Sequence, residues 1–92
     1  MSERVTRTLD VINARGLHAR ASAKLVKTAA QFDAQVSVGK DGHVVDAQSI
    51  MGLMMLAAGA GCCITVSAIG PDAQQAVDAV ADLVARRFDE ER

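Results

Sequence analysis

The apolar residues of this chain change their spacing from one stretch to the next, which limits the folds open to it. Residues 62–69 alternate, with Ile64, Val66 and Ala68 on one side, and this predicts a strand with one buried face. Residues 4–12 alternate more loosely, because Arg7 falls on the apolar side. Residues 19–32 and about 72–88 instead repeat every three to four positions, which predicts two amphipathic helices.

Turn signals place the remaining elements. Asp41-Gly42, between residues 34–39 and 43–47, predicts a β-hairpin. Residues 50–58 form an apolar run that predicts a short helix, stopped by the glycines after it. The last helix is expected to begin with a capping box of Asp72 and Gln75. The residues expected to face the sheet from the long helices are Ser22, Leu25, Val26, Ala29, Phe32, Ala73, Ala76, Val77, Val80, Leu83, Val84 and Phe88.

The resulting order is strand, helix, strand, strand, helix, strand, helix. It predicts an α+β fold in which three helices cover one face of a four-stranded antiparallel sheet. With 92 residues, the chain is expected to form one domain, residues 1–92. A domain of this size has a modest core, so we expect its function on the surface rather than in a deep cleft.

Composition excludes several functions. The net charge is −1 and there is no Trp or Tyr, so the chain lacks the basic excess and stacking platform of a nucleic-acid binder. The longest apolar stretch, residues 50–60, is too short to span a membrane, and no signal-peptide core is present at the N-terminus. We therefore expect a soluble cytoplasmic protein. Nothing demands more than a monomer.

Cys62 and Cys63 are adjacent in a predicted strand, so one should be buried and the other exposed. A redox or metal module built on this pair stays an alternative, although no ligands with metal-site spacing accompany it. No metal and no cofactor are expected. His43, beside the hairpin, is expected to be an ordinary surface residue.

His18 stands where a predicted turn, residues 13–16, meets the first helix. Free N–H groups and the helix dipole at such a position favour a phosphoryl oxygen, and they disfavour a protonated ring. A neutral imidazole can attack phosphorus, and Arg15 or Arg20 could stabilise the transferred charge. Gly16 permits the turn and a close approach by a partner's backbone. Taken locally, an ordinary polar histidine near a helix start fits as well.

Two motifs together make the chain recognisable. They are Asn13 with Gly16-Leu17-His18-Ala19-Arg20, and Gln48-Ser49-Ile50-Met51-Gly52-Leu53-Met54. In their spacing, and over essentially the whole chain, the sequence resembles the HPr family, the phosphocarriers of bacterial phosphoenolpyruvate-dependent phosphotransferase systems. This resemblance implies the open-faced β-sandwich fold.

The resemblance also implies roles. His18 corresponds to the histidine that Enzyme I phosphorylates on Nδ1 and that then passes the group to an EIIA-type acceptor. Arg20 corresponds to the active-site arginine. Ser49 corresponds to the serine modified by HPr kinase/phosphorylase in some bacteria. One departure is Ala21, where the family usually has Pro; it points to a divergent branch such as the nitrogen-related system.

Ser49 and the apolar helix after it have a physical interpretation of their own. Ser49 is a preferred N-cap, where a phosphate would be tolerated and would add about two negative charges. A short helix cannot bury every side, so some apolar residues should be exposed and dock partners, while Leu53 and Leu56 should be core. The residues expected to form the docking surface are Leu17, Arg20, Lys24, Lys27, Ile50, Met51 and Met54.

The sequence thus predicts a phosphoryl relay that works with partner proteins, not a free-standing enzyme. A docking module that has lost transfer is the alternative from another class, and Ala21 with Ser22 is its only support. Separately, the basic helix face also fits a plain solvated surface, and Ser49 fits a plain N-cap without regulation.

Overall fold

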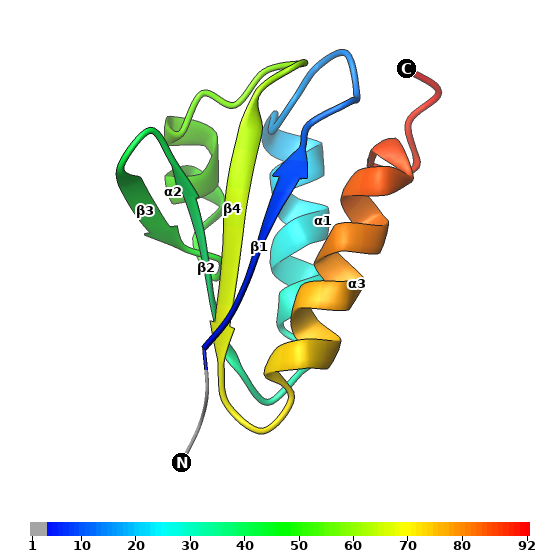
Figure 1. The fold of residues 1–92 in the computed structure, drawn as a ribbon. Helices are drawn as coiled ribbons and strands as arrows, with labels where there is room; N and C mark the ends of the chain where they lie inside the picture. Colours follow the sequence, from blue (N-terminus) through cyan, green and yellow to red (C-terminus); the bar gives the residue numbers. More distant parts are fainter. Residues whose placement is uncertain (1–3) are drawn as a thin grey trace.

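Four antiparallel strands form one sheet in the computed structural model, which describes residues 4–92. In sheet order these are β1 (Arg4–Asp10), β4 (Cys63–Ile69), β2 (Gln35–Lys40) and β3 (His43–Asp46). The helices are α1 (Ala19–Ala29), α2 (Ile50–Met55) and α3 (Ala73–Ala85), followed by a short turn, η1 (Arg87–Asp89). The helices cover one face of the sheet and leave the other open (Figure 1), which confirms the predicted α+β open-faced sandwich.

The alternation in β4 is the clearest link between sequence and sheet. Ile64, Val66 and Ala68 are buried against the helices, while Thr65 is exposed on the open face. Arg7 pairs in register with Val66, so its side chain starts on the helix side of β1. Because β1 is an edge strand, Arg7 reaches past α3 and its Nη1 lies 3.7 Å from Oδ1 of Asp78. Its place on the apolar side is therefore no defect in the strand.

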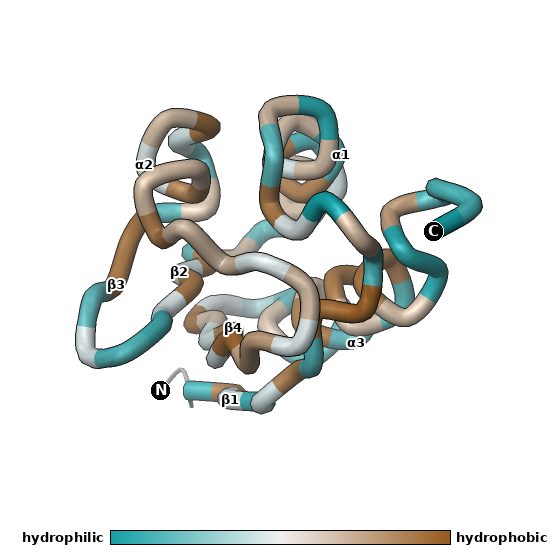
Figure 2. Tube along the Cα trace, turned by 90° about the horizontal axis from the view of Figure 1, so that it is seen from above, coloured by the Kyte–Doolittle hydropathy of each residue, from teal (hydrophilic) through white to brown (hydrophobic). Residues whose placement is uncertain are grey.

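The helices bury the stripes that their spacing predicts, with some shifts. All seven residues expected to face in from the last helix are buried, including Phe88 beyond its end. In α1, Ala21 is buried although it was not expected to be, whereas Val26 is only half-buried, as is Phe32 beyond the end of the helix. Hydrophobic segments gather where α1 and α2 meet the strands, and the C-terminal segment is hydrophilic (Figure 2).

Three predicted helix ends are wrong. The last helix ends at Ala85, not near Phe88, and the short turn η1 follows it. The first helix ends at Ala29, not Phe32. The second ends at Met55, because Ala57 turns to a φ of 53° and stops it before the glycines can. None of the helices in residues 4–92 is long and apolar enough to cross a membrane.

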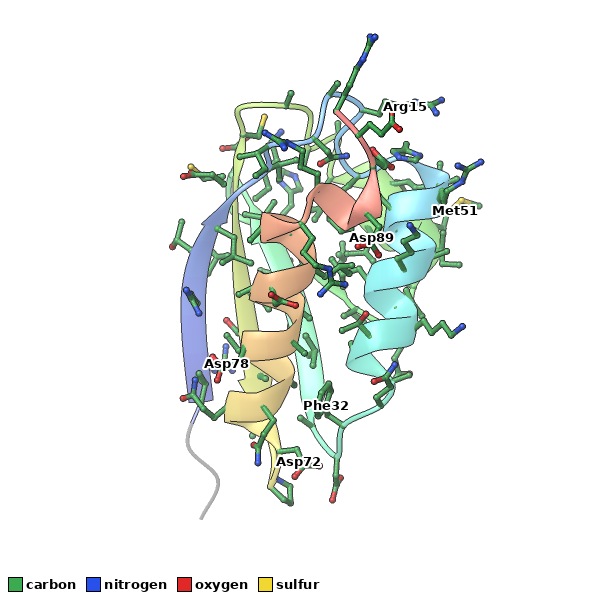
Figure 3. The ribbon with its side chains drawn as sticks, turned by 90° about the vertical axis from the view of Figure 1, so that its right-hand side faces the viewer. Arg15, Phe32, Met51, Asp72, Asp78 and Asp89 are labelled. Atoms are coloured by element: carbon green, nitrogen blue, oxygen red, sulfur yellow. The ribbon has the colours of Figure 1, made fainter. Side chains whose placement is uncertain are left out.

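The capping box at the start of α3 is also wrong, because Asp72 is used elsewhere. Its Oδ2 accepts a hydrogen bond from the backbone N–H of Asp33 at 2.8 Å, and its own N–H donates to the Asp33 carbonyl at 3.0 Å. No side chain caps α3. Asp72 instead joins the loops before β2 and α3, at the end of the molecule where Figure 3 shows Phe32 and Asp72.

Candidate functional site

The loop between β1 and α1 is shaped by a close contact with the loop after α2. Gly16 has a φ of +62°, and a Cβ atom there would lie 2.2 Å from the backbone oxygen of Ala58. The next residue, Leu17, donates its N–H to that same oxygen at 2.9 Å. Only glycine fits such a position, since it accepts positive φ and has no Cβ. The backbone that approaches Gly16 closely is thus the chain's own, not a partner's as the sequence had led us to expect.

Leu17 points into the core. Its side chain is only 4% exposed, so the prediction that it forms part of the exposed docking surface is wrong. The physical reason is the Gly16 turn, which pins the backbone of Leu17 to Ala58 and directs its side chain inward. The hydroxyl of the buried Ser22 donates a hydrogen bond to the Leu17 carbonyl at 3.0 Å and so adds a second contact to the Leu17 backbone.

Asn13 is fully buried in the same loop, with 0% exposure. Its Nδ2 donates to the carbonyl of Gly16 at 2.9 Å and to Oε1 of Glu90 at 3.0 Å. Its Oδ1 has no hydrogen-bond partner among the described residues. Both of its partners are acceptors, which fixes the orientation of the amide.

His18 is the N-cap residue of α1, with extended backbone at φ −70° and ψ 178°. Its carbonyl accepts a hydrogen bond from the N–H of Ser22 at 2.9 Å, which is the first hydrogen bond of the helix. The N–H groups that come before Ser22 in the first turn therefore have no partner within the helix. The His18 ring does not cap them. Its Nε2 instead bonds Oε2 of Glu90, and the two side chains are 19% and 17% exposed.

Glu90 is the site residue that the sequence analysis missed, since it lies 72 positions from His18. Partial burial acts to raise the pKa of its carboxyl, but hydrogen bonds from His18 and Asn13 outweigh it and hold the pKa below its ordinary value. The carboxylate is therefore ionised at neutral pH. A left-handed backbone turn at η1 brings it here, and no local sequence pattern signals that turn.

Basic and acidic residues together line an open depression beside the C-terminal segment. Arg15, Arg20 and Lys24 line one side of it, and Asp89, Glu90 and Glu91 line the other. Arg20 is exposed and forms no ion pair within residues 4–92. Lys24, in contrast, donates to the Phe88 carbonyl at 2.7 Å. Arg15, which is exposed and likewise forms no ion pair within residues 4–92, and Arg20 are thus the two cations left available to an anion at this end of α1.

A second, shallower depression joins His18 to α2. Its lining includes Arg15, His18, Met54 and the loop of residues 57–59. The exposed residues of α2 are Ile50, Met51, Met54 and Met55, with Met51 71% and Met55 79% exposed. Figure 3 shows Met51 on this side of the molecule. The predicted burial of Leu53 and Leu56 is confirmed. An apolar surface therefore starts at the histidine and continues over α2.

Ser49 caps α2 as predicted. Its Oγ accepts a hydrogen bond from the N–H of Gly52 at 2.9 Å, and the residue is exposed. Lys27, in the last turn of α1, is exposed as well.

The cysteine pair shows no metal site. Cys62 is half-buried and Cys63 is exposed, so the expected alternation holds only in part. A hydrogen bond from Cys63 Sγ to Asp10, together with the negative charge of Asp10, raises the pKa of this thiol and disfavours the reactive thiolate. No group of three or more potential ligands that could hold a metal ion occurs in the described part of the chain.

Comparison with known proteins gives consistent matches over nearly the whole chain. Residues 5–86 match the family model described as the PTS HPr component phosphorylation site. A phosphocarrier protein HPr from Cupriavidus necator is 54% identical over 91% of this chain and 94% of its own length. A phosphocarrier protein NPr from Shewanella violacea is 40% identical over 95% and 96%. Among solved structures, HPr-C-His from Thermoanaerobacter tengcongensis is similar, with a TM-score of 0.91 and 41% identity over 96% and 99%.

Proposed function

This chain belongs to the HPr family of phosphocarrier proteins, and on that premise we propose that His18 takes a phosphoryl group from phosphorylated Enzyme I and gives it to an EIIA-type protein. The observation that carries the proposal is which contacts the His18 ring makes and which it does not. The ring stands at the start of α1 without capping it, and Nε2 is the nitrogen held by Glu90. Nδ1 is then the nitrogen with a lone pair for phosphorus.

The transfer needs few further groups. The Nδ1 lone pair forms a bond to phosphorus while the bond from phosphorus to the donor breaks, and its electron pair stays with the donor. Arg20, exposed and without an ion pair among the described residues, is our candidate to hold the phosphoryl oxygens in a charge-assisted contact. The N–H groups of the first turn of α1 supply further donors.

The docking surface that we propose consists of Ile50, Met51 and Met54 together with Arg20 and Lys27. Its apolar residues are exposed on α2, and Met54 borders the same depression as His18. Flexible methionines suit a surface that meets more than one partner. Lys24 contributes charge nearby, although its ammonium group is held by the Phe88 carbonyl.

We propose that this relay works in the cytoplasm. We propose also that it works as a monomer, because one chain carries both the proposed reacting ring and the arginine. Relatives named HPr and NPr both carry the phosphocarrier name, so the role does not depend on the branch of the system. Enzyme I and the EIIA-type acceptor bind in turn at the same face.

Ser49 is proposed as a regulatory acceptor for HPr kinase/phosphorylase. It is exposed and directly precedes the exposed apolar residues of α2. Phosphate on Ser49 would bring about two negative charges next to the docking surface. Partners that approach through apolar contact and negative charge would then bind less well.

The histidine assignment is tested with purified Enzyme I and phosphoenolpyruvate. The wild-type protein is expected to take up acid-labile phosphate, located on His18 by mass spectrometry, and His18→Ala to take up none. His43→Ala is the matched control, because His43 is an exposed histidine on the hairpin. Uptake by His18→Ala at the wild-type level, or loss of uptake in His43→Ala alone, would overturn the assignment.

The serine assignment is tested with HPr kinase/phosphorylase and ATP. Acid-stable phosphate is expected on the wild type and absent from Ser49→Ala, with Ser67→Ala as a control on the open face of the sheet. The Ser49-phosphorylated protein should then accept phosphoryl groups from Enzyme I more slowly. An unchanged rate would sink the regulatory role.

A further inference from the structure

We propose that Glu90 is a positioning residue for the phosphoryl-accepting histidine: it holds the N–H of His18 Nε2 and so directs the Nδ1 lone pair to the incoming group. The inference rests on the proposed function, since it assumes that His18 is the acceptor. It assigns a role to the C-terminal segment, which lies far from the two motifs that identify the site.

The contact between Glu90 and His18 is supported by a buried residue, Asn13. Asn13 is fully buried and is held to the Gly16 carbonyl at 2.9 Å. Its amide also donates to Oε1 of Glu90 at 3.0 Å, while Oε2 of the same carboxylate bonds His18 Nε2. A carboxylate with each oxygen bound to a different residue cannot rotate freely. The position of the imidazole is thus tied to the core through Glu90 and Asn13.

The backbone that carries Glu90 is itself held in place. Arg87, Phe88 and Asp89 have φ values of 57°, 54° and 62°, a left-handed run that non-glycine residues rarely adopt. Phe88 in its middle is 0% exposed, and its carbonyl accepts the ammonium group of Lys24 at 2.7 Å. Figure 3 shows Asp89 between the end of the chain and α1. A buried aromatic ring therefore fixes the turn that delivers the carboxylate to His18.

The chemistry of the contact selects one form of the ring. An ionised carboxylate only accepts hydrogen bonds, so Nε2 must carry the hydrogen. A neutral imidazole has a single N–H, and Nδ1 is then left with its lone pair. Hydrogen bonds from His18 and Asn13 lower the pKa of Glu90 against the effect of burial, so it is an acceptor at neutral pH.

The same contact serves both halves of the relay. When Nδ1 bonds phosphorus, the ring acquires a positive charge that both nitrogens share, and the Glu90 carboxylate stabilises it. When an acceptor attacks phosphorus, the bond to Nδ1 breaks and its electron pair returns to the ring. The proton stays on Nε2 throughout, so Glu90 holds a proton and does not transfer it.

The test begins on the free protein, where no phosphorylation is needed. The ¹⁵N chemical shifts of the two His18 ring nitrogens, measured at a pH where the ring is neutral, report which nitrogen carries the hydrogen. In the wild type, Nε2 should be protonated and Nδ1 not. In Glu90→Ala the two shifts should move toward each other as the second tautomer becomes populated. Asp33→Ala is the control, since Asp33 is an exposed carboxylate beside Asp72, at the other end of the molecule, and forms no ion pair among residues 4–92.

The second measurement is the rate of phosphoryl uptake from Enzyme I. Glu90→Ala should lower it about tenfold, as loss of a group that orients a functional histidine does elsewhere, while Asp33→Ala should keep the wild-type rate. Circular dichroism confirms that both variants fold.

The inference fails if Glu90→Ala leaves the two ¹⁵N shifts unchanged, or if it lowers transfer no more than Asp33→Ala. A wild-type protein that shows the predicted tautomer but takes up no phosphate would contradict the proposed function instead, so the two failures are distinguishable.

Discussion

The helices α1 and α2 begin in opposite ways. Ser49 closes the start of α2 with its own side chain, which accepts the N–H of Gly52. His18 occupies the equivalent place on α1, but its ring makes no such bond and points to Glu90 instead. The start of α1 is ordered by distant parts of the chain, namely Ala58 and Glu90.

The difference follows from what each side chain is free to do. A serine oxygen bound to its own helix satisfies an otherwise unpaired N–H and fixes the helix start within a few residues. A ring that accepts a phosphoryl group, as we propose for His18, cannot be used in this way, because its nitrogen must stay available. The order at the start of α1 therefore has to come from tertiary contacts. Substitutions at those contacts test the difference between the two helices.

The largest effect is expected from Gly16→Ala, at the start of α1. A Cβ there would lie 2.2 Å from the Ala58 oxygen, a backbone atom, and the φ of +62° adds strain for any residue with a side chain. We expect a loss of about 3 kcal/mol in the free energy of unfolding, measured by urea denaturation.

Gly52→Ala is the matched control in α2. Its Cβ would meet the Ser49 Oγ at 3.1 Å and Val45 Cβ at 3.3 Å, contacts that small shifts relieve. Alanine also favours helix over glycine by about 1 kcal/mol, so the net change should stay below about 1 kcal/mol. Equal losses in the two variants would contradict the view that the start of α1 depends on distant backbone.

The same difference, between contacts with sequence neighbours and contacts with distant residues, separates the features that the sequence could predict from those that it could not. Alternation in β4, the Asp41-Gly42 hairpin and the Ser49 cap depend on neighbours in sequence, and all three are as predicted. The prediction that Leu17 belongs to the exposed docking surface was wrong, because its burial depends on the distant Ala58.

Asp72 shows how a local pattern can mislead. Its spacing from Gln75 fits a capping box, but a bond to the Asp33 N–H competes for the same carboxylate and wins. No sequence pattern indicated that Glu90 lies at the site. The left-handed turn that brings it there contains no glycine and is held by the burial of Phe88. Prediction stops where a side chain has more than one partner within reach.

A smaller effect is expected from Ser49→Ala, which removes the cap of α2. The Gly52 N–H loses its acceptor, and the free energy of unfolding should fall by about 1 kcal/mol. Ser49→Asp, which keeps a capping oxygen, should retain most of the stability. Alanine as stable as serine would show that α2 does not depend on its own cap.

Amide hydrogen exchange turns this prediction into a direct comparison of the two helix starts. In Ser49→Ala the Gly52 amide should exchange faster, because its partner is gone. In His18→Ala the Arg20 and Ala21 amides should exchange no faster than in Glu90→Ala, because both variants lose the same contact and the ring never bonded these amides. If they exchanged faster than in Glu90→Ala, the ring would be capping α1 in solution, and it could not then present a free nitrogen without first leaving its own helix.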